Sequence, residues 1–202
     1  MTRTARHALT ARGHQVAVSD LHAMGFDPVS DRRNFTSMAN PERLKQQDEE
    51  ALASRTNGYA PELQAEMNKL AWCDLLIFQF PLWWLGPPAI LKGWIDRVFV
   101  VGRSYGGGRW FDTGMHRGKR ALCSLTVGGP KTMYEPGGHY APIGQILYPL
   151  HYGLLGFTGF TVLEPFVVHG PSRMDDAGRK EQLALYQKRL LALGQERLPA
   201  TG

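Results

Sequence analysis

Apolar residues along the chain follow two alternating spacings, and this alternation predicts an α/β fold. Helical spacing or helix-forming composition marks six segments, at residues 2–12, 41–53, 61–72, 89–101, 148–156 and 177–193. Short runs typical of strands lie at residues 15–21, 75–80, 120–126 and 160–168. Because strands alternate with helices, the pattern predicts one domain over residues 1–202, built as a doubly wound parallel sheet with helices on both faces.

The run at residues 75–80 is nearly all apolar, which indicates a strand covered on both faces, as in a parallel sheet. In such sheets, ligands bind beyond the carboxyl ends of the strands. The loop that follows this run has two adjacent indoles, and its residues are Pro81, Leu82, Trp83, Trp84 and Leu85. The rings could pack against a flat cofactor whose polar edge bonds to loop N–H groups. They could also anchor a proline-rich corner or a subunit contact, and the spacing alone does not decide between these interpretations.

A second candidate loop follows the strand predicted at 120–126. Its paired glycines, Gly128 and Gly129, would let the backbone approach a ligand closely, although a simple turn also explains them. Tyr134 and His139 lie further on and could donate protons or stabilise charge, but a lone Tyr and His in a loop are more often structural. The sequence has no dinucleotide-binding glycine fingerprint, no Walker loop and no zinc-ligand spacing, so no metal site is expected.

Composition narrows the class of protein further. The 202 residues carry 23 Lys and Arg against 18 Asp and Glu, and the net charge of +5 would help to attract an anionic ligand such as a nucleotide cofactor. The basic residues form only short clusters in turns, so no nucleic-acid partner is expected.

Cys73 and Cys123 lie in or beside apolar runs and are expected to be free thiols in a reducing compartment. The start of the chain is not signal-like, and Gln79 and Pro81 interrupt its most apolar stretch. A cytoplasmic protein without membrane insertion is therefore expected.

Three segments together resemble one family of enzymes. They are FQFPLWWLGPPAILKGWIDRVF at residues 78–99, the stretch from SLTVGG to VLEP at 124–165, and SDLHAMGFDP at 19–28. These segments closely resemble the NAD(P)H quinone dehydrogenase family, which contains DT-diaphorase and its bacterial relatives. The resemblance extends over almost the whole chain.

The resemblance implies a flavodoxin-like fold, a tightly bound flavin and a homodimer with active sites at the subunit interface. The flavin is expected to be FAD, with FMN as the alternative. The implied reaction is a two-electron ping-pong, in which NAD(P)H transfers hydride to flavin N5 and leaves before a quinone is reduced in the same pocket.

The resemblance also assigns roles to individual residues. Pro81 to Leu85 resemble the loop that lies along the flavin ring, with Trp84 near the nicotinamide or quinone. The segment at the pyrimidine edge of the flavin corresponds to Thr126, Val127, Gly128 and Gly129. Tyr134 and His139 resemble the pair that stabilises charge on the reduced flavin and relays a proton, and Gly129 and His139 are also expected to face the substrate. Tyr105 resembles a substrate-pocket tyrosine supplied by the partner subunit, and Arg179 aligns near the residues that contact the adenine of FAD.

The chain departs from the family pattern in three places. The spacing from Tyr134 to His139 is one residue shorter than in the mammalian relatives, and a second pocket tyrosine is replaced within the three glycines at 106–108. Family members also begin with an apolar strand and a phosphate-binding loop, whereas this chain begins at the helix that follows them. Without that central strand, residues 15–21 are expected either to pair beside residues 75–80 or to leave backbone groups unpaired.

Two explanations of the short start stay open: a start placed too late within a longer protein, or a short and degenerate chain.

A flavin-dependent quinone reductase, with activity reduced by the missing segment, is the expected function. The alternative is a flavin-free regulatory or ancillary subunit on the same scaffold. A one-electron carrier is disfavoured, because such carriers are usually acidic.

Overall fold

The computed structural model describes residues 1–195 and shows helices alternating with parallel strands. The helices are α1 (Thr2–Thr10), α2 (Gln46–Thr56), α3 (Pro61–Trp72), α4 (Ala89–Val98), α5 (Ile143–Ile146), α6 (Tyr148–Leu150), the π-helix η4 (His151–Gly156) and α7 (Asp176–Gln195). The strands are β1 (Leu75–Pro81), β2 (Arg120–Val127), β3 (Thr161–Val162) and β4 (Phe166–His169). All six predicted helical segments are therefore confirmed, with ends that differ by a few residues.

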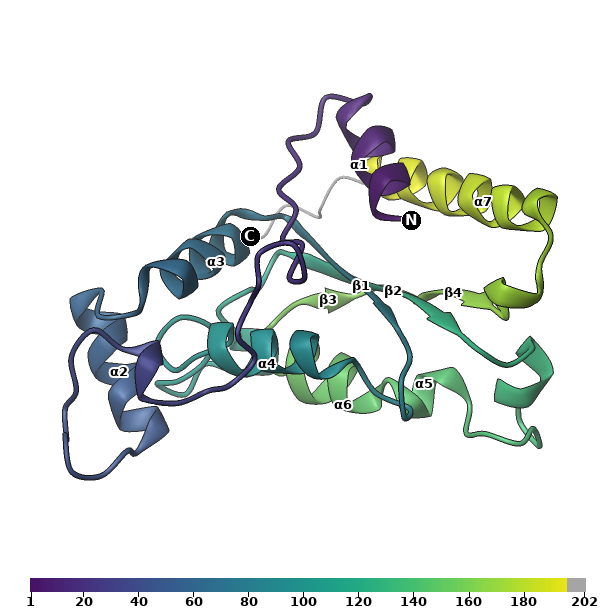
Figure 1. Cartoon of the computed structure of the whole chain (residues 1–202). Coiled ribbons are helices and arrows are strands. Elements are labelled where there is room, and N and C mark those ends of the chain that lie inside the picture. Colours follow the sequence, from purple (N-terminus) through teal and green to yellow (C-terminus); the bar gives the residue numbers. More distant parts are fainter. Residues whose placement is uncertain (196–202) are drawn as a thin grey trace.

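The sheet is parallel throughout, with β2 between β1 on one side and β3 and β4 on the other (Figure 1). β1 and β2 pair along their whole length, from Leu75 opposite Arg120 to Pro81 opposite Thr126. The single strand predicted at 160–168 is divided into β3 and β4, which pair with β2 separately. Pro165, just before β4, has no N–H to donate to the ladder, which accounts for the interruption.

Helices cover both faces of this sheet, as predicted (Figure 1). On one face α1 and α7 bury an apolar cluster that contains Leu9, Tyr186 and Leu190. On the other face α3, α4 and η4 contribute to a larger core around Phe78 and Trp94. Each fully buried aliphatic or aromatic side chain contributes about 1.5–3 kcal/mol to this packing. The fold is the doubly wound α/β arrangement expected from the sequence.

The prediction of a strand at residues 15–21 is wrong, because these residues run extended without pairing to any strand. A cavity of about 880 Å³ separates them from β1. Their position is fixed instead by a side chain: the Ser19 hydroxyl donates to the buried Glu66 carboxylate at 2.5 Å. A strand needs a neighbour within hydrogen-bonding distance, and among the described residues the facing edge of β1 has none. Of the two outcomes expected for this segment, the one with unpaired backbone groups is observed.

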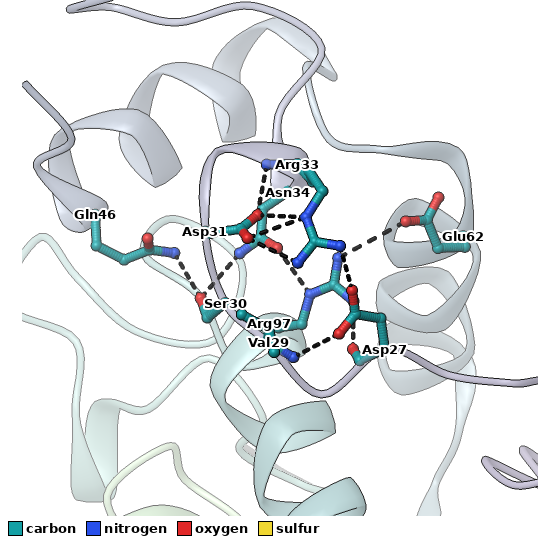
Figure 2. A network of polar contacts seen from close by, with 9 residues as sticks. All are labelled: Asp27, Val29, Ser30, Asp31, Arg33, Asn34, Gln46, Glu62 and Arg97. Atoms are coloured by element: carbon teal, nitrogen blue, oxygen red, sulfur yellow. Dashed lines mark hydrogen bonds and ion pairs between the residues drawn. The ribbon is translucent and has the colours of Figure 1, made fainter. Parts of the chain in front are cut away.

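A polar network fastens the long excursion between residues 22 and 40 to α4 (Figure 2). Its centre is Arg97, whose side chain is only 3% exposed. Arg97 Nε donates to Asn34 Oδ1 at 2.7 Å, and Nη1 donates to the Asp27 carbonyl at 2.5 Å. The guanidinium also lies 5.2 Å from the centre of the Phe26 ring. Gly93 in α4 lets the loop at Pro28 lie against the helix, since a Cβ on Gly93 would lie 2.2 Å from the Pro28 carbonyl oxygen.

Both cysteines are free thiols, as expected. Burial raises the pKa of the Cys123 thiol to about 12, so it is unreactive at neutral pH.

Within residues 1–195, no helix is long and apolar enough to cross a membrane. The same residues hold no group of three or more His, Cys, Asp and Glu side chains placed to bind a metal ion.

Candidate functional site

The two loops singled out from the sequence lie side by side at the carboxyl edge of the sheet. β1 and β2 are in register, so Pro81 and Thr126 are opposite one another at the ends of their strands. The Leu82 N–H then donates to the Thr126 carbonyl at 2.8 Å. The structure therefore brings together the segments Pro81 to Leu85 and Thr126 to Gly129, at the edge where parallel sheets bind ligands.

The indole-bearing loop is a tight turn with an unusual backbone. Trp83 and Gly86 exchange both of their backbone hydrogen bonds, at 3.0 and 2.9 Å. The two residues between them, Trp84 and Leu85, have φ angles of 50° and 58°. Such angles favour Gly or Asn, and a larger residue there costs about 1–3 kcal/mol. The Trp84 side chain is fully exposed, so its burial in this chain does not offset the strain. Strain of this kind concentrates at functional sites.

Replacing Trp84 by Asn and Leu85 by Gly together should stabilise the protein by about 1–2 kcal/mol, because both residues then suit positive φ. The change removes an exposed ring, and little packing is lost with it. Denaturant unfolding measures the effect. The matched control is Trp84→Phe with Leu85→Met, which keeps both strained positions and should leave stability unchanged. Equal stability of the Asn-Gly variant and the wild type would show that the turn is not strained.

The paired glycines have different surroundings. A Cβ added to Gly128 would meet no atom within 4 Å, so open space lies against its backbone. A Cβ added to Gly129 would lie 2.9 Å from Met133 Sδ and 3.2 Å from the Tyr134 ring. Gly129 is therefore required by packing, whereas Gly128 leaves its backbone accessible to a ligand. Open space at Gly128, in the loop that pairs with the one carrying the exposed Trp84, could accept a flat group with a polar edge.

Tyr134 and His139 lie close to this edge but do not form a directly packed pair. Tyr134 is buried at the end of the short helix η3 (Lys131–Tyr134), and its ring stacks on Tyr140 at 5.2 Å. His139 is exposed, and its ring lies edge-on to the Tyr140 ring, with 5.1 Å between the ring centres. The loop folds back because the Tyr140 N–H donates to the Met133 carbonyl at 2.8 Å. Tyr140 thus lies between the two predicted partners, and the sequence analysis did not identify it.

Sequence reasoning also missed two residues, one at the end of β4 and one just after it. His169 is the last residue of that strand, and its ring lies 5.6 Å from the ring of Tyr134. Arg173, at the end of the 3₁₀-helix η5 (Pro171–Arg173), donates from its guanidinium to the Gly128 carbonyl. The rule that ligands bind beyond strand ends applies to His169 as well, because His169 directly follows the strand predicted at residues 160–168.

The remaining predicted residues are more distant. Arg179, in the first turns of α7, donates to the Met174 carbonyl and pairs with Asp176. Tyr105 lies at the opposite edge of the sheet, because α4 runs back from the carboxyl ends and the loop after it leads into the start of β2. There its ring packs against Phe157 at 5.8 Å. Within one chain the structure therefore does not bring Tyr105 to the other candidate residues.

These features define the class of protein. A family model described as a flavodoxin-like fold matches residues 1–190, in agreement with the parallel sheet between two helical layers. A solved structure of a candidate quinone reductase from Klebsiella pneumoniae is 36% identical and superposes with a TM-score of 0.92, over 98% of this chain and 79% of that chain. The flavodoxin-like fold expected from the sequence is confirmed.

Sequence relatives give the family itself. NAD(P)H dehydrogenase [quinone] 1 from Cavia porcellus is 42% identical over 191 residues, which cover 94% of this chain and 70% of that protein. Ribosyldihydronicotinamide dehydrogenase [quinone] from Rattus norvegicus is 38% identical over 197 residues, which cover 97% of this chain and 85% of that protein. The chain therefore belongs to the NAD(P)H quinone dehydrogenase family, a family of enzymes, as its motifs indicated.

Proposed function

We propose that this protein is a flavin-dependent NAD(P)H:quinone oxidoreductase. The observation that supports the proposal is the pair of neighbouring loops at the carboxyl edge, one with the fully exposed ring of Trp84 and the other with the open backbone of Gly128. The names of the relatives, which are NAD(P)H and ribosyldihydronicotinamide dehydrogenases of quinones, support the same activity.

The two loops have distinct tasks in this proposal. Pro81 to Leu85 would support the flat ring system, and the backbone of Thr126 to Gly129 would bond its polar edge. When bound, the flavin supplies the hydride-accepting and hydride-donating centre that links NAD(P)H to the quinone in a ping-pong reaction. Trp84 and Gly129 would border the space where the nicotinamide and then the quinone lie. The stiff turn at Trp84 keeps that border fixed.

Tyr134 and His139 would handle charge and protons. The Tyr134 ring is held by stacking on Tyr140, which fixes the direction of its hydroxyl. His139 is exposed and can exchange protons with solvent. Because Tyr140 lies between these two residues, they would act on different parts of the site and not through direct contact.

A homodimer would complete the site. Exposed aromatic residues cluster where the helices α6 and η4 meet the loop before β2. Trp110 stacks on Phe157 at 6.3 Å, and Tyr152 lies 5.0 Å from both Phe111 and Tyr148. Exposed aromatic surface of this kind marks subunit contacts. Tyr105 packs against the same cluster, so the proposed subunit interface would include Tyr105, and the family resemblance is what assigns the partner's Tyr105 to the substrate pocket.

FAD is the proposed flavin, and the cytoplasm is the proposed location. The Arg179 guanidinium is half-exposed at the start of α7, on the ligand-binding side of β4, where it could reach an adenine nucleotide. The unpaired cysteines suit a reducing compartment. FMN would leave Arg179 without a ligand.

Steady-state kinetics test the proposed function. The protein, loaded with FAD and freed of excess dye, should accelerate the oxidation of NADH or NADPH by a soluble benzoquinone or naphthoquinone. The two nucleotides and the two quinones are compared at saturating concentrations. Failure of the loaded protein to accelerate the oxidation of either nucleotide by either quinone would contradict the proposal and favour the ancillary-subunit alternative.

A further inference from the structure

A side chain from the turn after β4 reaches across to the loop after β2. The Gly170 N–H donates to the Val127 carbonyl at 2.8 Å, and the Arg173 N–H donates to the Gly170 carbonyl at 2.9 Å. The turn is thereby folded back toward the end of β2. From there the Arg173 guanidinium donates through Nη1 to the Gly128 carbonyl. Arg173 therefore joins the turn after β4 to the paired glycines of the proposed flavin site.

Gly170 leaves room for this bond. Its φ angle is 59°, which glycine adopts without strain. A Cβ added to Gly170 would lie 3.7 Å from Arg173 Nη1 and 3.8 Å from the Gly128 carbonyl oxygen, so it would touch both ends of the bond. A hydrogen bond from a guanidinium to a carbonyl is stronger than a bond between neutral groups. The backbone of the turn is thus compatible with a strong bond at this place.

The bond from Arg173 fixes the orientation of the peptide that links Gly128 to Gly129. In a planar trans peptide the carbonyl and the following N–H point to opposite sides. Because the Gly128 carbonyl is held toward Arg173, the Gly129 N–H points away from Arg173. Within residues 1–195 that N–H has no protein acceptor. It is therefore a donor that is already oriented and not yet used.

Without Arg173, little else would hold this peptide in one orientation. Glycine adopts positive and negative φ about equally well, so a peptide between two glycines can turn over at low cost. A Cβ added to Gly128 would meet no atom within 4 Å, so no neighbouring atom packs closely on that side of the backbone. Turning the peptide over would direct the Gly128 carbonyl to the side that the Gly129 N–H now faces. A donor would then be replaced by an acceptor.

We propose that Arg173 is a positioning residue, which keeps the peptide between Gly128 and Gly129 turned so that the Gly129 N–H faces the polar edge of the flavin. The inference rests on the proposed function and adds a residue to its machinery. Arg173 acts through the peptide and not by contact with the flavin. A donor that is oriented before binding reduces the cost of ordering the site.

Flavin affinity of Arg173 variants tests this role. Arg173→Met keeps a flexible stem and removes the donor, so FAD should bind about tenfold more weakly. Arg173→Lys retains a charged donor and should recover most of the affinity. Arg12→Met is the matched control, because Arg12 is exposed in the turn after α1 and lies outside the two loops. Equal FAD affinities of Arg173→Met and Arg12→Met would overturn the inference.

NMR spectra of the flavin-free protein separate failure of this inference from failure of the proposed function. In Arg173→Met the carbonyl carbon resonance of Gly128 should shift upfield, and the Gly129 amide should broaden as the peptide exchanges between two orientations on the μs–ms timescale. Arg173→Lys should resemble the wild type. A wild type that binds no FAD contradicts the proposed function, and these spectra then decide whether Arg173 orients the peptide. Unchanged Gly128 and Gly129 resonances in Arg173→Met would overturn the inference even if FAD affinity fell, because the charge alone would then be responsible.

Discussion

Replacing Gly128 by Leu is expected to weaken FAD binding by about 100-fold or more, while the protein keeps its stability. An added Cβ meets no atom within 4 Å, so the variant should fold normally. Its side chain would extend into the space proposed for the flavin ring, and overlap there costs about 3 kcal/mol. Quenching of flavin fluorescence on titration with protein measures the affinity.

Gly144→Leu is the matched control for this experiment. An added Cβ there also meets no atom within 4 Å, and Gly144 lies in α5, outside the two loops. The control should bind FAD like the wild type. If Gly128→Leu binds FAD as tightly as Gly144→Leu, the flavin ring does not lie against the Gly128 backbone.

Replacing Arg97 by Met should destabilise the protein by about 3–5 kcal/mol. The substitution keeps an apolar stem but removes the donors to Asn34 Oδ1 and the Asp27 carbonyl. Each acceptor left unsatisfied in a buried setting costs about 1–3 kcal/mol, and the contact of the guanidinium with Phe26 is lost as well. Equilibrium unfolding in urea measures the change.

Arg33→Met provides the contrast for Arg97, because both arginines belong to the network in Figure 2. The Arg33 side chain is 61% exposed and pairs with Asp27 and Asp31 at the surface. Exposed pairs of this kind contribute little to stability, so the urea midpoint of this variant should match that of the wild type. Similar destabilisation by both substitutions would show that burial of Arg97 is not what makes it important.

The parts of the fold that depend on local pattern could be predicted from the sequence. The apolar runs that became β1 and β2 pair along their whole length. Pro61, which suits the first position of a helix, begins α3. The strand predicted at 15–21 failed because a strand depends on a neighbour, and a local pattern does not show whether that neighbour is present. The same limitation hid the Arg97 network, whose partners Asp27 and Asn34 are 70 and 63 residues away in sequence.

The candidate site could likewise be predicted from the sequence only in part. The rule of strand ends identified the two loops at Pro81 to Leu85 and Thr126 to Gly129, which the structure places together. It could not show that Tyr140 lies between Tyr134 and His139, because this depends on how the intervening loop folds back. His169 follows the strand predicted at 160–168, so the same rule applied to it, but only the structure shows its contact with the Tyr134 ring. The roles of these residues stay predictions.

The visible absorption spectrum of the protein during one anaerobic cycle tests the central proposal most directly. The protein is incubated with FAD, separated from free dye, and treated first with one equivalent of NADPH and then with a quinone. The account predicts a bound-flavin spectrum near one per chain, which bleaches with NADPH and returns with quinone. A colourless protein, or bound flavin whose spectrum NADPH leaves unchanged, would contradict it.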